Sequence, residues 1–552
     1  MKKIKLLIER IRVSVDCSDE MIVSQAKEKM KRAGISTASL HFRLYKKSID
    51  ARNKQEIRFE CAVLAEGDIP QKSLNEKILA RAQARVLNEE EPNLTFGKDP
   101  MPAAPVVVGM GPAGLFAALL LAQNGYAPIL IDRGGSVAER TADVSRFRDE
   151  GILNTESNVQ FGAGGAGTFS DGKLITRISD PLCNYVIKSL VAFGAPEDIC
   201  IKAKPHVGTD ILRVVVDNIL DEIKRLGGQV MYHCRMDGIS ECSDKTLSIK
   251  TTKGDLHAGA LLLAPGHSAR DTYRYLIEQN YAVEAKPMSV GVRVEHLQAD
   301  IDRALYGNFA GHPNLGPAEY ALSDTKGERG VYTFCMCPGG EVVAAASEDG
   351  GLVVNGMSYH ARSNPNANAA VAVSVRCEDY EKEEGSAPLG AIAFQRRIER
   401  AAFVAGGKDY YAPVMTMQDF LGATQTHTRG RVEPSYRDGK VREADLATVF
   451  PSFVTDSLRY GFRSFGQKIA GFDAPDTMLT AAETRTSAPI RILRNKETMT
   501  ALGHPLIYPC GEGAGYAGGI TSAAVDGLRA AMALMSSFAP TQKNQYNFGV
   551  PL

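Results

Sequence analysis

One short segment restricts the fold of this chain more than any other. Residues 106–108 are three valines, and they run directly into Gly109-Met110-Gly111-Pro112-Ala113-Gly114. A helix-like stretch follows as far as Asn124, and a second apolar run over 128–131 ends in Asp132. Strand, glycine turn, helix and second strand in this order are the context in which G-x-G-x-x-G has physical meaning. The segment predicts a Rossmann-like βαβ unit that binds a dinucleotide.

Each part of this pattern has a separate physical task. Gly109 allows the tight turn, Gly111 lets backbone N–H groups approach a pyrophosphate, and Gly114 permits close packing of the helix on the strand. Asp132 lies about 20 residues further on, where an acid accepts a hydrogen bond from the adenosine ribose. A purely structural glycine turn is the alternative, and the ordered strands and helix around it argue against that interpretation.

Composition sets the broad class of protein. The 552 residues are 44% hydrophobic, enough for a large core and for two or three domains. Lys and Arg together number 64, as do Asp and Glu, so the whole chain has no general electrostatic preference for nucleic acid or membranes. No apolar run approaches the ~18 residues of a membrane span, and Glu9 and Arg10 interrupt any signal-peptide pattern. Ten scattered cysteines fit reduced thiols, so we expect a cytoplasmic protein.

Four further glycine-rich or turn-forming segments bear on function: 161–174, 263–267, 483–487 and 508–520. Their order and content resemble FAD-dependent oxidoreductases of the two-domain, glutathione-reductase-like class. The chain is most similar there to bacterial FAD-dependent dehydrogenases whose substrate is unassigned. The resemblance runs from about residue 40 to 535 and is most specific at 162–174 and 511–520.

The resemblance implies an α/β protein with a three-layer Rossmann-like FAD-binding domain built on a parallel sheet. We predict a small basic α+β module at 1–92, the first part of the FAD-binding domain at 93–285, an inserted α+β substrate domain at 286–490, and the returning part of the FAD-binding domain at 491–552. The acidic and Pro-rich stretch from Glu89 to Pro105 is the expected linker into the first strand.

The resemblance also assigns residues to FAD. The pyrophosphate would lie at the fingerprint, the adenosine half at Asp132 and Arg133, and the adenine at the backbone of Met236. The full implied set is Gly109, Gly111, Pro112, Ala113, Gly114, Asp132, Arg133, Gly164, Gly165, Ala166, Gly167, Thr168, Met236, Ala264, Gly266, Gly511, Glu512, Gly518, Gly519 and Ile520. Two positions depart from the family pattern. Pro265 stands within Ala-Pro-Gly where Ala-Thr-Gly is usual, and Ala163 stands where Glu is usual, which removes any role of that side chain but spares the backbone of the loop.

The C-terminal segment has a physical rationale of its own. Glycines let the chain pass close to a flat ring, and a helix beginning near Ile520 would aim its positive N-terminal end at that ring. Reduced flavin carries negative charge near N1 and O2, so such a helix raises the flavin potential. By the resemblance, Glu512 would contact the ribityl chain. A glycine-rich surface loop is the alternative interpretation.

Three side chains are candidate catalytic residues. Lys173 and His267 lie next to turns assigned to the cofactor, where either could donate a proton or clamp a substrate. Arg485 could pair with an anion against the flavin or substrate. Each also has a purely structural alternative, which for Arg485 is a surface ion pair.

No metal site is expected. Cys335 and Cys337 have C-x-C spacing, which is neither a thioredoxin-like C-x-x-C nor half of a zinc site, and we interpret them as buried thiols in a strand. His427 has no second ligand at metal-binding spacing, and Arg429 and Arg431 close by would repel a cation.

The electron donor is left open by the sequence. A second G-x-G-x-x-G with its own βαβ unit is absent, because the literal matches at 162–167 and 513–518 fall inside the flavin-type segments. NAD(P)H would therefore dock transiently, or electrons would come from the substrate or a protein partner.

The expected activity is hydride transfer between flavin N5 and an unidentified small-molecule substrate. A flavin-dependent reductase of unsaturated lipid-like compounds is an alternative that an apolar, aromatic cavity would favour. A flavoprotein associated with RNA is a third hypothesis, because residues 1–60 carry 15 basic against 8 acidic residues, an excess of seven. The absence of an RRM-type aromatic motif argues against nucleic acid.

Overall fold

The computed structural model describes residues 2–69, 75–87, 93–381, 387–422 and 430–540. Two compact units make up the chain. Unit 1 comprises residues 1–92, 196–206 and 299–318, and unit 2 comprises 93–195, 207–298 and 319–552. Part of the expected linker, Glu89–Pro92, and His427 lie outside the described residues. No helix among the described residues is long and apolar enough to cross a membrane.

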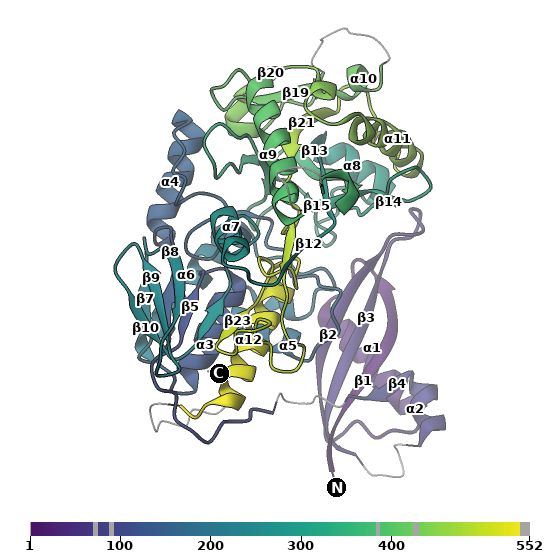
Figure 1. The fold of residues 1–552 in the computed structure, drawn as a ribbon. Coiled ribbons are helices and arrows are strands. Elements are labelled where there is room, and N and C mark those ends of the chain that lie inside the picture. The colour runs from purple at the N-terminus through teal and green to yellow at the C-terminus, as the bar shows by residue number, and fades with distance from the viewer. Residues whose placement is uncertain (1, 70–74, 88–92, 382–386, 423–429, 541–552) are drawn as a thin grey trace. The chain divides into compact units, whose positions relative to one another are not determined.

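Unit 1 is built on an antiparallel sheet with strand order β2-β3-β1-β4 (Figure 1). Its strands are β1 Lys2–Ser14, β2 Leu40–Asp50, β3 Arg58–Ile69 and β4 Ala84–Val86, and its helices are α1 Asp19–Arg32, α2 Glu76–Ala82 and nearly all of α8, Gln298–Tyr306. In β1 the buried positions change from Leu6 and Ile8 to Ile11 and Val13, because a bulge at Arg10, with φ +56°, shifts the alternation by one residue. The sheet therefore keeps one apolar face along the whole strand, against which α1 packs.

Unit 2 contains a five-stranded parallel sheet with order β23-β11-β5-β6-β7. These strands are β5 Val106–Val108, β6 Ile129–Ile131, β7 Gln229–Met231, β11 Leu261–Leu263 and β23 Ile507–Pro509. The helix after β5 is α3, Pro112–Gln123, with Gly111 as N-cap and proline at its first position, which suits a helix start. The βαβ unit expected from the sequence is thus present, and it forms the centre of a mixed α/β fold.

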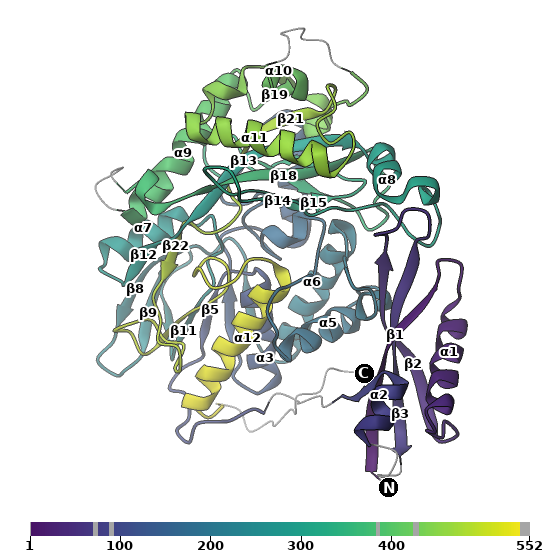
Figure 2. The same ribbon diagram turned by 90° about the vertical axis from the view of Figure 1, so that its right-hand side faces the viewer.

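The parallel sheet is covered on both faces. Val106 and Val108 contribute to a core with an antiparallel meander, whose strands are β8 Met236–Glu241, β9 Leu247–Thr251 and β10 Leu256–Ala258. The side chain of Val107 points the other way, as strand geometry requires, towards Gly114 of α3. There α3 packs on α6, Thr209–Arg225, and on the C-terminal helix α12, Ile520–Ser537 (Figures 1 and 2).

A seven-stranded sheet forms the rest of the core of unit 2, in the order β14-β15-β18-β13-β21-β19-β20. Its strands are β13 Met288–Leu297, β14 Ser323–Asp324, β15 Val331–Cys337, β18 Asn366–Val375, β19 Ala412–Thr416, β20 Val441–Glu443 and β21 Met478–Glu483. Helix α11, Ser452–Lys468, lies across β13, β15 and β18 (Figure 2), and the hairpin of β16 Glu341–Ala344 and β17 Val354–Met357 packs on the same strands. Coverage from both sides explains why β13 and β18 are buried along almost their whole length.

The remaining elements connect these sheets. They are α4 Val137–Glu150, α5 Leu182–Ala192, α7 Arg270–Glu278, β12 Val283–Ala285, α9 Ala387–Ala405, α10 Met417–Phe420 and β22 Ile490–Ile492. Two local features depart from a regular strand and from a helix with a side-chain cap. The apolar run 230–235 is not one strand, because the chain turns at His233, with φ +51°, between β7 and β8. Helix α6 is capped by Gly208 without a side-chain cap, since Thr209 Oγ1 donates to the carbonyl of Thr168 at 2.5 Å.

Candidate functional site

The glycine segments converge on one cavity in unit 2, with about 1510 Å³ of empty space including its open mouth. The wall contains these residues of the implied FAD set: Gly109, Gly111, Pro112, Ala113, Asp132, Arg133, Gly165, Ala166, Gly167, Met236, Ala264, Gly266, Gly511, Glu512, Gly519 and Ile520. Four members of the set, Gly114, Gly164, Thr168 and Gly518, do not line it. Lys173, His267 and Arg485 do.

The glycines around the cavity fall into two physical classes. A Cβ on Gly109 would lie 2.1 Å from the carbonyl oxygen of Ala264, and one on Gly114 would lie 1.8 Å from that of Gly109. These two glycines are required by the packing of the protein itself. A Cβ on Gly111 would meet only Gly165 Cα at 3.8 Å, and one on Gly519 would meet nothing within 4 Å. Gly111 and Gly519 form the second class, and they keep the cavity wall open at the N-termini of α3 and α12, as a pyrophosphate and a flat ring require. The residues present therefore fit FAD.

Two alanine substitutions separate these classes. We expect Gly111→Ala to change the free energy of unfolding of the FAD-free protein by no more than about 1 kcal/mol, because the new methyl group meets open space. It should weaken FAD binding roughly 10- to 100-fold, the value of one charge-assisted hydrogen bond to phosphate. Gly114→Ala should instead cost about 1–3 kcal/mol of stability through overpacking. Denaturant melts measure the stability of both variants, and FAD titrations measure their affinity for the cofactor. Equal losses of stability in the two variants would contradict the division into two glycine classes.

Asp132 stabilises the glycine turn that precedes α3 by accepting a backbone hydrogen bond from it. Its Oδ2 accepts a hydrogen bond from the backbone N–H of Met110 at 2.8 Å, and its Oδ1 accepts from Gly134 N at 2.9 Å. Each carboxylate oxygen has a second lone pair, so the side chain can also accept from a ligand hydroxyl in the cavity. Arg133 beside it pairs with Asp271 at 2.5 Å and lies 4.5 Å from the centre of the Phe161 ring. These contacts hold both residues in place on the cavity wall.

The glycine-rich loop 161–174 is held by a residue that the sequence analysis missed. Arg140 of α4 is fully buried, and its guanidinium donates to the carbonyl groups of Asn158 at 2.8 Å, Val159 at 2.9 Å and Ala163 at 2.7 Å. It also lies 4.7 Å from the centre of the Phe169 ring. A sequence signal existed, because Arg140 falls three residues after Val137 and seven before Phe147, on the apolar face of the helix. Arg140 thereby fixes the backbone of the loop that lines the cavity.

The C-terminal segment reaches the cavity as its glycines suggested. Gly511 adopts φ +78°, and its N–H donates to Asp526 of α12 at 2.7 Å. A Cβ on Gly511 would lie 2.6 Å from Ala113 Cβ, so this turn packs against the start of α3. Gly519 is the N-cap of α12 and lines the cavity, so the positive end of the helix faces that space.

Glu512 is the titratable group of this segment. Burial raises its pKa from an ordinary value of 4.5 to about 7, although the positive charge of Lys286 opposes the shift. Since the folded protein favours the neutral acid, the stability that this group contributes is present below pH 4.5 and is lost as the pH rises to about 7. We expect the unfolding temperature of the FAD-free protein to fall between pH 5 and 8 relative to that of Glu512→Gln. Unfolding temperatures that change with pH in the same way for the two proteins across this range would refute the expectation.

Two of the candidate catalytic residues have defined partners. Lys173 Nζ lies 3.2 Å from Glu319 Oε2 and donates to the carbonyl of Met336. His267 Nδ1 lies 2.9 Å from Ser268 Oγ, and burial together with the nearby Arg485 and Arg270 lowers its pKa to about 3. His267 is therefore neutral at physiological pH and can orient a ligand by a hydrogen bond, but it cannot supply an imidazolium proton there.

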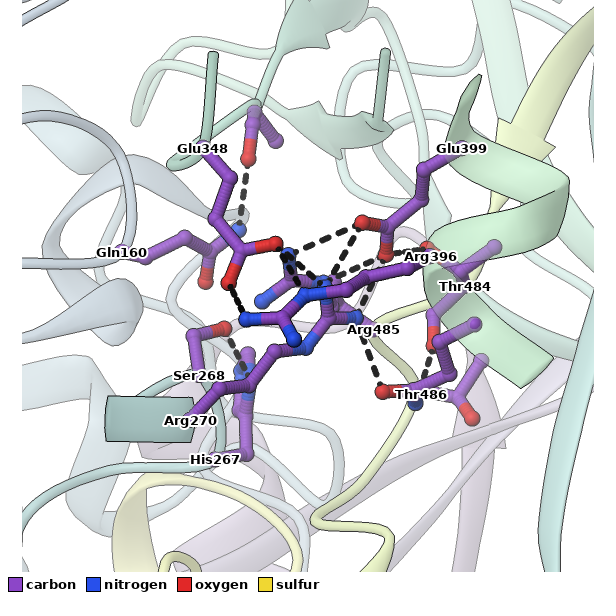
Figure 3. Close-up of polar contacts among 12 residues, drawn as sticks. Gln160, His267, Ser268, Arg270, Glu348, Arg396, Glu399, Thr484, Arg485 and Thr486 are labelled. Carbon is purple, nitrogen blue, oxygen red and sulfur yellow. Dashed lines mark hydrogen bonds and ion pairs between the residues drawn. The ribbon is translucent and has the colours of Figure 1, made fainter. Parts of the chain in front are cut away.

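Arg485 belongs to a buried ionic cluster and not to a surface ion pair (Figure 3). The carboxylate of Glu399 accepts from Arg270 Nη2 at 2.8 Å and from Arg485 Nε at 2.8 Å. Glu348 accepts from Arg396 Nε at 2.8 Å and from Arg270 Nη1 at 3.0 Å. Burial opposes ionisation of Glu399, but the two guanidinium groups outweigh it and hold its pKa well below the ordinary range. Three arginines face two carboxylates, which leaves one excess positive charge.

Arg485 brings this cluster to the cavity wall. Arg485 is 4% exposed and lines the cavity, and its Nη1 is buried without a hydrogen-bond partner among the described residues. A buried donor of this kind is costly unless something accepts from it. Gln160 also lines the cavity, and its Oε1 is likewise without a partner in the described part of the chain. The site thus offers one charged donor and one neutral acceptor to a bound molecule.

A second buried ion pair stands beside the first. Glu483, at the end of β21, accepts from Arg293 Nε at 2.8 Å, and Arg293 Nη1 donates to the carbonyl of Cys335 at 2.9 Å. The interpretation of Cys335 and Cys337 as buried thiols is wrong for one of them. Cys337 is buried, but Cys335 is exposed, because the strand bulges there, and both line the cavity.

Comparison with known proteins places the chain in a family. Residues 287–486 match the model of the family described as "FAD-dependent protein, C-terminal domain-like". These residues contain the seven-stranded sheet, Cys335, Glu399 and Arg485. An uncharacterized protein of Clostridium beijerinckii is 45% identical over 543 residues, which cover 96% of this chain and 98% of that protein.

Two solved structures show a low level of similarity. The tetracycline destructase Tet(51) is 9% identical, with 78% of this chain and 80% of that chain covered and a TM-score of 0.31. CtdE in complex with FAD is also 9% identical, with 79% and 86% covered and a TM-score of 0.29. Likenesses this weak say nothing about activity, so the assignment depends on the family model and the clostridial relative. The chain belongs to the same family as the Clostridium beijerinckii protein, and its residues 287–486 match the model of the C-terminal domain of FAD-dependent proteins.

Proposed function

We propose that the protein is an FAD-dependent oxidoreductase that transfers hydride between flavin N5 and a small-molecule substrate in the cavity of unit 2. The observation that carries this proposal is the open glycine wall at the N-termini of two helices, α3 and α12, which face one cavity. The first suits the pyrophosphate, and the second suits the negative charge of a reduced flavin ring. FAD, when bound, supplies the redox chemistry. The protein binds the cofactor, orients it against the substrate and tunes its reduction potential.

Individual residues take the following roles in this proposal. Asp132 accepts from the adenosine ribose while its other lone pairs keep the turn closed, and Glu512 accepts from the ribityl chain. Arg485 uses its unpaired Nη1 to hold an anionic group of the substrate or flavin, and neutral His267 orients that group. Lys173 is held by Glu319 at the same wall, as a positioning group for substrate.

The character of the wall bears on the alternative of lipid-like substrates. Phe161 and Phe334 are aromatic, but Lys173, Glu483 and Arg485 line the same space. Charged groups at the wall are costly to cover with hydrocarbon, so they favour a polar or anionic substrate. We therefore propose a polar substrate, with NAD(P)H as a transient reductant that has no Rossmann domain of its own.

The visible spectrum of the purified protein tests the reaction type. A flavin spectrum that bleaches under anaerobic conditions on addition of NADPH or NADH is the expected result, and it would show that a nicotinamide reaches the flavin. A bound flavin that stays oxidised with both nicotinamides would instead leave direct substrate oxidation or a protein donor as the source of electrons.

One observation favours the RNA hypothesis as a second candidate function. A groove in unit 1 is lined by five basic residues and a single acidic one, Glu28; the basic residues are Arg10, Arg12, Lys29, Arg32 and Arg81. Burial and the charge of Arg10 lower the pKa of Lys29, as expected where positive charges gather. Such a groove suits a phosphate backbone.

Binding of single-stranded RNA at increasing salt tests this second candidate. If all five groups contact phosphates, the logarithm of affinity should fall with that of salt with a slope of roughly −3.5. The double variant Arg10→Ala/Arg81→Ala should reduce this slope, whereas Arg43→Ala on β2, outside the groove, should not. Binding with no salt dependence, or none at all, would remove nucleic acid as a partner of this groove.

A further inference from the structure

Two thiols share the wall of the cavity that the proposed function gives to FAD. Cys335 and Cys337 lie in β15 and both line the cavity, the first exposed and the second buried. The Cys337 thiol donates to the carbonyl oxygen of Cys335, with an S···O distance of 3.3 Å. The Cys337 thiol is therefore held against the backbone of Cys335 in the wall of the proposed flavin cavity, and the roles proposed above use neither residue.

The backbone of β15 departs from a regular strand at this pair. Phe334 pairs with Ala370 and Cys337 with Asn368, so the strand holds one extra residue there, and Cys335 has φ +41°. In a regular strand the Cα atoms of residues i and i+2 lie about 6.6 Å apart, which is close to the upper limit of the Cα separations that disulfides bridge. A bulge bends the strand at such a point. A left-handed backbone at a residue other than glycine is strained, and strain of this kind gathers at functional sites.

Two cations are fixed to the backbone of the same three residues. Arg293 Nη1 donates to the carbonyl of Cys335 at 2.9 Å, and Lys173 Nζ donates to the carbonyl of Met336. Desolvation by the surrounding protein raises the pKa of both thiols, although the Cys335 residue is exposed to the cavity, and the positive charges of Arg293 and Lys173 oppose that shift at each of them. Positive charge close to a thiol favours the thiolate, which is the reactive form.

We propose that Cys335 and Cys337 form a redox-active dithiol that exchanges two electrons with the flavin bound in this cavity. The inference rests on the proposed function, because it needs FAD there. In one direction both S–H bonds break, one S–S bond forms, and two electrons and two protons pass to oxidised flavin, giving reduced flavin. In the other direction reduced flavin returns them and the S–S bond breaks. The protein then holds two two-electron couples, so its full reduction takes up four electrons.

Anaerobic reductive titration of the FAD-loaded protein with dithionite tests this. After oxidation with ferricyanide, we expect an uptake of four electrons per FAD, two by the flavin and two by the disulfide. Thiol counting after denaturation gives an independent readout on the unmodified protein. All ten cysteines should react in the reduced protein, and two fewer, eight, in the oxidised protein.

Serine variants identify the pair. Cys335→Ser and Cys337→Ser should each lower the uptake to two electrons per FAD while flavin remains bound. Cys242→Ser, a half-buried cysteine that does not line the cavity, should keep four. If either pair variant fails to fold, the thiol count of the unmodified protein still decides the question.

The possible outcomes distinguish failure of this inference from failure of the proposed function on which it rests. A protein that binds FAD, takes up two electrons and shows ten thiols after oxidation overturns the dithiol and leaves the oxidoreductase proposal standing. A protein that retains no FAD under any condition overturns both. Four electrons in the unmodified protein and two in both pair variants establish the exchange.

Discussion

Glu399→Ala is expected to lower the free energy of unfolding by about 3–5 kcal/mol. This carboxylate is the shared acceptor of two buried guanidinium groups, and it also accepts from Thr484 Oγ1 at 2.7 Å. Its removal would leave Arg485 without a carboxylate partner, since Glu348 pairs with Arg270 and Arg396. An unpaired charge in a buried site is the costly outcome, whatever the net value of the intact cluster. Urea unfolding followed by circular dichroism measures the effect.

A surface ion pair provides the control for this variant. Asp221 lies 3.0 Å from Lys224 one helical turn away, and its side chain is 74% exposed. Asp221→Ala should change stability by no more than about 0.5 kcal/mol, because such pairs are screened by water. If Glu399→Ala proved equally mild, the cluster around Arg485 would not be a buried ionic network, and the charged donor assigned to the cavity would lose its basis.

Arg140→Met should cost at least about 3 kcal/mol of stability and abolish retention of FAD. Methionine fills most of the space, but the carbonyl groups of Asn158, Val159 and Ala163 lose their donor. Each buried acceptor left unsatisfied costs roughly 1–3 kcal/mol. Because these carbonyls lie in the loop that lines the cavity or just before it, the loop should lose its shape before the rest of unit 2 unfolds. Thermal melts and the flavin retained after gel filtration measure the two effects.

The matched control is the second arginine that contacts the same aromatic ring, Arg213. Arg213 and Arg140 lie 4.6 Å and 4.7 Å from the centre of the Phe169 ring, but the Nε of Arg213 is buried without a hydrogen-bond partner among the described residues. Arg213→Met should therefore cost about 1 kcal/mol or less, the value of the cation–π contact alone, and leave FAD bound. Equal losses in the two variants would show that the ring contact, and not the carbonyl contacts of Arg140, holds the loop.

The parts of the fold that the sequence predicts are those with local, periodic patterns. The βαβ unit over 106–132 was predictable because every constraint lies within thirty residues of the fingerprint. The seven-stranded sheet in 286–490 was not predictable from the sequence. Strands β13 and β18 are buried on both faces, so neither shows the alternation of apolar and polar residues by which a strand is identified.

The candidate site divides in the same way. Glycine segments lining the cavity could be named because each carries its own turn chemistry. Arg485 was named, but its partner Glu399 lies 86 residues away, and only the fold brings them together. The roles of Arg140 and Glu399 could be suspected only from a charge on the apolar face of a helix, which by itself does not identify a partner.

The flavin content of the reconstituted protein tests the central claim most directly. Purified protein would be incubated with excess FAD or FMN, passed through gel filtration, and its flavin absorbance compared with the protein concentration. We expect about one FAD per chain and little FMN, because the fingerprint and Asp132 act on the pyrophosphate and adenosine that FMN lacks. Loss of both flavins on the column, or equal retention of the two, would contradict the assignment of this cavity to FAD.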